Sequence, residues 1–172
     1  LLWAVFAFVY SELMARPVAI AVSVLVILSL SLTSFLPSIW GNYKYLYRHR
    51  NYYGFYKVYE SKEKRSLTNG SILHGAQYLA KERQSEPLTY YTYSTPVGAM
   101  LKSPFFDFKR IGIVGLGTGT LAAYGAPDKT IDFFELDPEV YAIAKKYFTY
   151  LDDSKSKITY VIGDARLSLA AV

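Results

Sequence analysis

Three glycines and two carboxylates occur at a spacing that could bind a nucleoside. Gly115, Gly117 and Gly119 follow the apolar run RIGIV at alternate positions, and glycine lets a backbone adopt positive φ and approach a ligand closely. Glu135 ends the next apolar run, twenty residues after Gly115, where a carboxylate can accept both ribose hydroxyls. Asp164 ends a third run, in IGDAR, where an acidic side chain and a neighbouring amide can contact the amino edge of adenine.

The glycine spacing narrows the class of nucleoside. The dinucleotide pattern G-x-G-x-x-G requires glycine at position 120, where this chain has Thr120. The observed G-x-G-x-G is the pattern of folds that bind S-adenosylmethionine or its relatives. Glu135 does not discriminate, because NAD-binding and adenosylmethionine-binding folds share a carboxylate there.

Residues 110–172 alternate between strand and helix patterns. The runs RIGIVGL, TIDFFEL and KITYVIGDA predict strands, TGTLAAYG opens a first helix, and a second helix starts at Asp137 and Pro138. This order predicts an α/β fold, the first half of a Rossmann-like, methyltransferase-type doubly wound parallel sheet. In such a sheet the first strand is central, so we expect its second edge to lack a partner from these residues and to invite pairing or aggregation.

Residues 41–109 predict a juxtamembrane segment and a small antiparallel β element. The segment NYYGFYKVYE has strand composition, SKEKR is a polar turn, and Asn69-Gly70 is a strong hairpin signal. A short helix is expected to follow Thr95 as N-cap, with Pro96 in its first position.

Residues 1–40 predict a transmembrane region. The nineteen residues between Pro17 and Pro37 carry no charge, and at about 1.5 Å per residue they match the ~30 Å thickness of a bilayer core. We favour a transmembrane helix over a buried core helix, because core helices of this length nearly always carry a polar stripe. The opening LLWAVFAFVY is too short to span alone and predicts the tail of a preceding helix, joined to the next through residues 11–17.

The segment after this helix predicts the orientation in the membrane. Aromatic and basic residues alternate there: Trp40, Tyr43, Lys44, Tyr45, Tyr47, Arg48 and Arg50. Aromatic belts lie at headgroup depth and basic flanks favour the cytoplasmic side, so residues after about 50 are predicted to be cytoplasmic. The net charge of +5 and pI of about 9.2 are then explained by a lipid bilayer, and we expect no nucleic-acid partner.

Composition excludes several kinds of site. The chain has no cysteine, which rules out disulfides, thiolate zinc sites and cysteine nucleophiles. His49 and His74 are its two histidines, so we expect no metal site. For His74, a backbone-bonded position at a strand end is favoured over a catalytic role. Because the chain starts at Leu1 within an apolar run and stops at Val172 in a helix pattern, we expect a fragment of a longer protein.

The motifs VGLGTG, FFELDPEV and GDAR resemble the nucleoside half of the spermidine synthases, which are aminopropyltransferases. The whole chain resembles membrane-fused spermidine synthase-like proteins, since RNYYGFYKV, LTNGSILHGAQ and PLTYY are similar to their β entry and substrate-gate region. The resemblance implies decarboxylated S-adenosylmethionine or S-adenosylmethionine as co-substrate, and a small polyamine as acceptor.

The resemblance also implies residue roles. Gly115, Gly117 and Gly119 would border the sulfonium end of the nucleoside, Glu135 would hold the ribose, and Asp164 the adenine. Gln77 would lie against the thionucleoside, and Tyr90 or Tyr91 would line the amine pocket.

Two departures from the family affect the expected chemistry. Thr118 stands where soluble synthases carry an aspartate that holds the aminopropyl tail. The family's catalytic aspartate follows a fourth strand, which these residues do not include, so no residue is identified as catalytic. Three functions therefore stay open: aminopropyl transfer to a polyamine with release of methylthioadenosine, methyl transfer from S-adenosylmethionine, and a non-catalytic, membrane-tethered nucleoside-binding module. A homo-oligomer also stays open.

Overall fold

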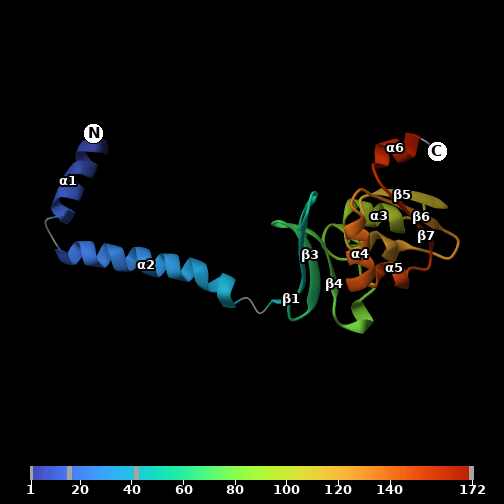
Figure 1. Cartoon of the computed structure of the whole chain (residues 1–172), viewed down its shortest axis with the longest axis horizontal. Helices are drawn as coiled ribbons and strands as arrows, with labels where there is room; N and C mark the ends of the chain where they lie inside the picture. Colours follow the sequence, from blue (N-terminus) through green and yellow to red (C-terminus); the bar gives the residue numbers. More distant parts are fainter. Residues whose placement is uncertain (1, 15–16, 41–42, 171–172) are drawn as a thin grey trace. The chain divides into compact units, whose positions relative to one another are not determined.

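The chain forms two compact units, residues 1–42 and residues 43–172. The structure, a computed structural model, describes residues 2–14, 17–40 and 43–170. Figure 1 shows their helices and strands.

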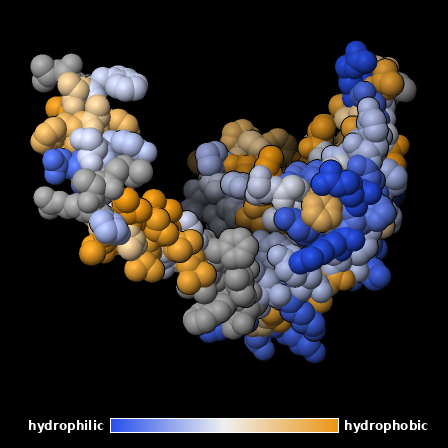
Figure 2. Space-filling view, turned by 60° about the vertical axis from the view of Figure 1, so that its left-hand side comes forward, coloured by the Kyte–Doolittle hydropathy of each residue, from blue (hydrophilic) through white to orange (hydrophobic). Residues whose placement is uncertain are grey.

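The first unit contains two apolar helices, α1 (Leu2–Met14) and α2 (Pro17–Trp40). Most of the described side chains of both helices are exposed, including Leu25, Ile27 and Leu28 at 59–65%, and Figure 2 shows the apolar surface of α2. Within these described stretches neither helix alone is long and apolar enough to cross a bilayer, and they meet that test only as a bent pair. The predicted transmembrane helix and cytoplasmic orientation stay predictions. Residues 15–16 of the predicted hairpin lie outside the described residues.

The second unit opens with a four-stranded antiparallel sheet. Its strands follow one another in space as in sequence: β1 (Lys44–Asn51), β2 (Gly54–Glu60), β3 (Lys64–Asn69) and β4 (Ile72–Tyr78). The Asn69-Gly70 turn joins β3 to β4, and Gly70 has the positive φ of 61° that such a turn requires. The predicted antiparallel element is confirmed, and β1 adds one strand to those that the sequence indicated.

Strand β1 corrects the interpretation of the segment after residue 43. Its residues pair with β2 from Lys44 to Asn51, and the hydroxyl of Tyr47 donates a hydrogen bond to the Glu139 carboxylate. Tyr47 therefore belongs to the folded domain and not to an aromatic belt. An alternation of tyrosine with basic residues suits a half-exposed strand as well as a membrane flank, so sequence alone did not place Tyr47 inside the fold. The side chain of Trp40 lies outside the described residues.

Short elements connect the two sheets of this unit. They are η1 (Lys81–Arg83), η2 (Thr89–Tyr91) and α3 (Pro96–Lys102). Helix α3 starts as predicted, because the Thr95 hydroxyl accepts a hydrogen bond from the amide of Gly98 at 3.3 Å and Pro96 takes the first helical position.

The second sheet is parallel, in the order β5 (Arg110–Val114), β6 (Thr130–Glu135), β7 (Lys157–Ile162). Helices α4 (Pro138–Tyr147), α5 (Tyr150–Asp153) and α6 (Ala165–Ala170) complete it. The Asp137 carboxylate caps α4 by accepting the Glu139 amide at 2.9 Å, as Asp137-Pro138 predicted. The mixed α/β architecture, with one antiparallel and one parallel sheet, is consistent with a Rossmann-like fold.

Two details of the parallel sheet concern earlier predictions. The connection after β5 is a short 3-10 helix, η3 (Thr120–Tyr124), and not the predicted α-helix. Gly119 enters it at a φ of 78°, and Gly125 ends it in an extended conformation, so no room is left for further turns. Strand β5 is at the sheet edge within the described residues, and Val114 is 68% exposed, as expected for an edge without a partner.

The hydrophobic core of this unit lies between the two sheets, which stand side by side in Figure 1. Val58 and Leu67 are completely buried on the antiparallel sheet. Ile131 and Phe133 are 1% exposed on β6, and Ile143 of α4 is 2% exposed. The shared core fixes β4 against the turn that follows β5, which positions the candidate site.

Candidate functional site

Two adjoining cavities open at the carboxyl ends of the parallel strands. The smaller has about 340 Å³ and the larger about 400 Å³. They share Val114, Gly115 and Glu135 in their walls. Ligands of open α/β sheets bind at this end of the strands, so the position agrees with the prediction from the glycine turn.

The glycine turn has a backbone conformation that side chains disfavour. Gly115, Gly117 and Gly119 have φ angles of 89°, 55° and 78°. A Cβ atom at Gly117 would lie 2.7 Å from the carbonyl oxygen of His74 on β4, whereas one at Gly115 would meet nothing within 4 Å. Gly115 therefore leaves open space at the cavities, and Gly117 permits close packing of the two sheets.

Gly119 has a structural position. A Cβ atom there would lie 2.7 Å from the side chain of Leu151, and Gly119 lines neither cavity. Of the three predicted glycines, the structure brings Gly115 and Gly117 to the cavity wall.

Glu135 is oriented by backbone hydrogen bonds from two loops, the glycine turn after β5 and the segment after β6. Its Oε2 accepts the amide of Leu116 at 2.8 Å, and its Oε1 accepts the amide of Asp137 at 3.0 Å. Each carboxylate oxygen can accept a further hydrogen bond. The side chain is thus held at the wall between the cavities, with acceptor capacity left for ligand hydroxyls.

Asp164 lies in the larger cavity, after β7. Its Oδ1 accepts the amides of Arg166 at 2.8 Å and Leu167 at 3.3 Å, which caps α6. The cap orients the carboxylate beside Gly163 and Arg166 in the cavity wall. Glu135 and Asp164, which are far apart in sequence, thus line one cavity.

Tyrosines and a histidine close the smaller cavity. Tyr90 and Tyr91 both line it, with their rings edge to face at 6.3 Å, and their role in an amine pocket stays a prediction. Tyr90 is 60% exposed. His74 also lines the wall, although sequence reasoning favoured a purely structural position.

Sequence reasoning missed Tyr56, Leu73 and Val140 in the same wall. Tyr56 is 4% exposed, and burial, together with a hydrogen bond to Asp137, raises its pKa well above the usual range, so the phenol stays protonated. Tyr56 is two residues before buried Val58, and alternate residues of a strand lie on the same face. The sequence could therefore have indicated that Tyr56 is buried.

A polar network anchors β1 to the start of α4, next to the site. Asn51 Nδ2 donates to Asp137 at 2.7 Å and to Glu139 at 2.9 Å, while His49 lies 3.5 Å from Glu139. The hydrogen bond to Glu139, with some burial, raises the pKa of Tyr47 to about 12. The antiparallel sheet therefore holds the helix that directly follows Glu135.

Gln77 lines neither of the two cavities. It is 2% exposed, its Nε2 donates to Gln84 O at 3.0 Å and to Thr149 Oγ1 at 2.8 Å, and its Oε1 accepts the Thr149 amide at 3.1 Å. These bonds tie β4 to the loop before α5. Contrary to the expectation of a thionucleoside contact, the structure gives Gln77 a purely internal set of partners.

Thr118 is buried within the glycine turn. It is 1% exposed, and its hydroxyl shares a 2.7 Å hydrogen bond with that of Thr120. A Cβ atom at Gly75 would come within 2.3 Å of Thr118 Oγ1, so β4 packs directly onto this side chain. Thr118 therefore places a neutral, internally bonded hydroxyl within the glycine turn.

Among the residues that the structure describes, no cluster of three or more His, Asp or Glu side chains could hold a metal ion. The polar groups of the site are instead carboxylates, backbone amides and phenols, which suit an uncharged sugar and a base.

No protein-family model matches the chain, and no curated protein matches it. Among solved structures, the chain is similar to the crystal structure of spermidine synthase from Thermotoga maritima. The two are 18% identical, with a TM-score of 0.49, over 69% of this chain and 40% of that one. The chain thus spans less than half the length of that enzyme.

Proposed function

We propose that this chain carries the nucleoside-binding part of an aminopropyltransferase. Its substrates would be decarboxylated S-adenosylmethionine and a small polyamine, and methylthioadenosine would be released. The observation that carries the nucleoside-binding part of the proposal is the position of Glu135, fixed by two backbone amides at the wall between two cavities.

The two cavities suit the two parts of such a donor. Adenine and ribose would occupy the larger cavity, between Asp164 and Glu135. The sulfonium and its aminopropyl chain would extend past Gly115 into the smaller cavity, toward Tyr90 and Tyr91. Phenol rings there can contact a cationic amine through their faces.

The reaction is a nucleophilic displacement. The amine nitrogen bonds to the carbon beside the sulfonium, that carbon–sulfur bond breaks, and both of its electrons stay on the sulfur of methylthioadenosine. The attacking nitrogen loses a proton to a base, to which we assign no residue. Because sulfonium is a good leaving group, alignment of the reactants is the main contribution required of the chain.

One observation favours a second reaction, methyl transfer from S-adenosylmethionine. Buried Thr118 supplies no negative charge at its position in the glycine turn, so its side chain does not repel the carboxylate of the intact donor. The two reactions differ in product, because methyl transfer releases adenosylhomocysteine.

We further propose that the first unit attaches the chain to a membrane. The support is the exposed apolar surface of α1 and α2, on which Trp3 is 83% and Leu25 65% exposed. Resistance of the membrane-bound chain to extraction at alkaline pH would agree with insertion. Full release would contradict it.

Calorimetric titration tests the nucleoside site. We expect the chain to bind methylthioadenosine and the decarboxylated donor more tightly than S-adenosylmethionine. Glu135→Ala should lower these affinities by about 10- to 100-fold, because a hydrogen bond to a charged group is worth about 1.5–3 kcal/mol. The control is Glu63→Ala, which removes an exposed carboxylate from the β2–β3 turn and should leave binding unchanged.

A second variant separates lost contacts from lost folding. Asp164→Asn keeps a side-chain oxygen to cap α6 and should weaken binding with little change in thermal unfolding. Tighter binding of S-adenosylmethionine would favour the methyltransferase. Absence of nucleoside binding by the folded chain would refute both enzymatic functions.

A further inference from the structure

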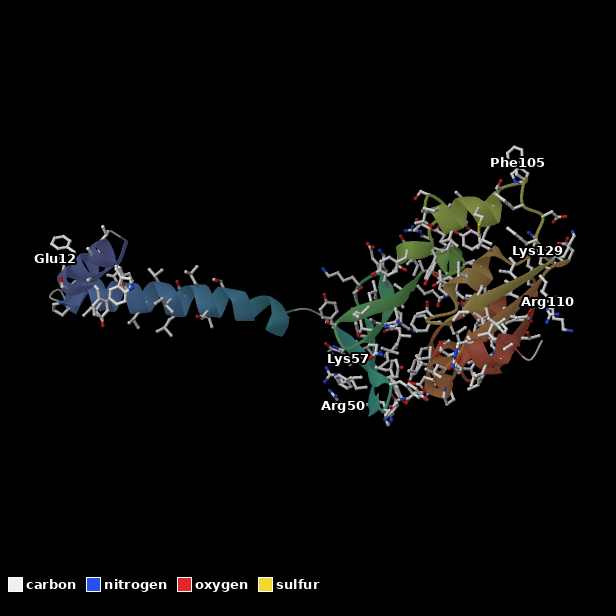
Figure 3. All side chains as sticks on the ribbon, turned by 90° about the horizontal axis from the view of Figure 1, so that it is seen from above. Glu12, Arg50, Lys57, Phe105, Arg110 and Lys129 are labelled. Atoms are coloured by element: carbon white, nitrogen blue, oxygen red, sulfur yellow. The ribbon has the colours of Figure 1, made fainter. Side chains whose placement is uncertain are left out.

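The outer face of the β1–β2 pair carries a cluster of cations, here called the basic face: Arg48, Arg50 and Lys57. Arg48 is directly opposite Lys57 in the register, and Arg50 is opposite Phe55. Alternate residues of a strand point to opposite sides. Since Tyr47, His49 and Asn51 contact the α4 carboxylates, Arg48 and Arg50 point away from the core. Figure 3 shows Arg50 and Lys57 projecting from the same part of the sheet.

No carboxylate neutralises the basic face among the residues that the structure describes. Its cations stack on rings: the Arg48 guanidinium carbon lies 3.5 Å from the Tyr45 ring centroid, and the Arg50 carbon 5.2 Å from that of Phe55. The neighbouring strand differs, because Arg65 of β3 pairs with Glu60 at 2.6 Å.

The arrangement of the basic face runs against the stability of the sheet. Like charges directly opposite each other on paired strands are destabilising, and Arg48 and Lys57 are such a pair. Residues that destabilise the fold are expected at positions where a binding function requires them. An anionic surface that contacts several of these cations at once would compensate for their mutual repulsion.

Exposed tyrosines surround these cations. Tyr43 is 51%, Tyr45 45% and Tyr52, in the β1–β2 turn, 95% exposed. Tyrosine is enriched where a protein meets lipid headgroups, and clustered Lys and Arg bind anionic lipids. In addition, β1 begins at Lys44, four residues after the apolar helix α2 ends at Trp40, so only a short segment joins the two.

We propose that the basic face binds the anionic headgroups of a lipid bilayer. The partner is the membrane surface itself, which the folded second unit contacts through Arg48, Arg50 and Lys57, with tyrosines at headgroup depth. This contact is separate from any insertion of α1 and α2, and it does not depend on the nucleoside-binding function.

A single fluorescent label tests this contact in the full chain. The sequence has no cysteine, so Tyr52→Cys can carry one environment-sensitive dye in the exposed turn, and Glu82→Cys can carry it on η1 as a reference. With vesicles containing phosphatidylserine, the dye at residue 52 should shift to the blue, and the dye at residue 82 should not. Neutral phosphatidylcholine vesicles should give no shift at either position, even if α1 and α2 insert.

Charge variants identify the responsible residues. Replacing Arg48, Arg50 and Lys57 together by Gln should weaken the response at residue 52 by about a hundredfold in lipid concentration, because each cation near an anionic surface contributes about 1 kcal/mol, or about fivefold. The matched control replaces three exposed lysines that form no ion pair in the described structure, Lys81, Lys146 and Lys155. It removes the same charge and should leave the response largely intact.

Three results would overturn the proposal. They are an equal shift with neutral vesicles, an equal loss in the control variant, and tighter binding of duplex nucleic acid than of anionic vesicles to the same three cations. The last would identify a nucleic-acid surface.

Discussion

Gln77 and Glu135 are both polar side chains that sequence motifs connect with a nucleoside. They differ in how much hydrogen-bonding capacity the protein leaves free for a ligand. All three hydrogen bonds of Gln77 are made to the protein at 2.8–3.1 Å, and the side chain is 2% exposed. Glu135 has one backbone partner on each oxygen and lines two cavities. Residue type alone does not make a site; spare hydrogen-bonding capacity beside open space does.

The contrast extends to the regions around them. Between the two sheets, polar groups make their hydrogen bonds within the protein. The buried Tyr150 hydroxyl donates to Ala76 O at 3.0 Å and to Glu86 O at 2.8 Å. Burial strongly raises the pKa of Tyr150. At the carboxyl ends of the strands, Gly115 faces open space. The sheet interface therefore positions the site, and the strand ends supply its ligand contacts.

The largest effect is expected where these two regions touch. Gly117→Ala would place a Cβ atom 2.7 Å from the His74 carbonyl oxygen at a φ of 55°. Backbone strain and overpacking together should lower the free energy of unfolding by about 3 kcal/mol, measured by chemical denaturation.

Gly70→Ala is the matched control for that prediction. Its φ is 61°, but a Cβ atom there would meet nothing within 4 Å, so only the conformational cost, about 1 kcal/mol, remains. Equal destabilisation by both variants would show that β4 does not press on the glycine turn.

A smaller effect, on stability alone, is expected at Gln77. Gln77→Leu should lower the free energy of unfolding by about 2 kcal/mol, because it leaves the amide of Thr149 and the carbonyl of Gln84 without their partner. The affinity of the folded chain for methylthioadenosine, measured calorimetrically, should be unchanged. A tenfold loss of affinity for methylthioadenosine with unchanged stability would show that Gln77 contributes to nucleoside binding.

Predictions from sequence succeeded where the signal was local. Asn69-Gly70, Thr95-Pro96 and Asp137-Pro138 act through their own backbone preferences, and the structure has a turn or a helix start at each. The parallel strands were equally accessible, because buried strands flanked by glycine and acidic residues have a distinctive composition.

Predictions were incomplete where distant partners decide the contacts of a residue. Tyr47 and Asn51 alternate along β1 to meet Glu139 of α4 and its N-cap Asp137, and nothing within the segment indicates these contacts. The partners of Gln77 likewise come from residues 84 and 149. Tyr56 lines the cavity because of the way one sheet packs on the other, which a single sequence does not encode locally.

The smallest effect is expected at the amino ends of the parallel strands, opposite the cavities, where Figure 3 shows Arg110 and Lys129. Arg110 Nε donates to Asp132 at 2.5 Å, and this bond, supported by the Thr159 hydroxyl, lowers the pKa of the Asp132 carboxyl. Because the folded pKa lies below the unfolded value of about 3.9, ionised Asp132 stabilises the fold above that pH. This contribution is lost as the pH falls through the folded pKa.

Arg110→Gln should therefore change stability only slightly at neutral pH, since Arg110 is 72% exposed. It should also make acid unfolding depend less on Asp132, because the folded pKa of that carboxyl would move up toward its unfolded value. Thermal unfolding followed between pH 6 and pH 2.5 measures the change, with Lys109→Gln, whose carboxylate partners Asp107 and Asp128 are exposed, as the control. A loss of methylthioadenosine affinity in Arg110→Gln would contradict the separation of the two ends of the sheet. It would show that the amino end affects ligand binding at the carboxyl end.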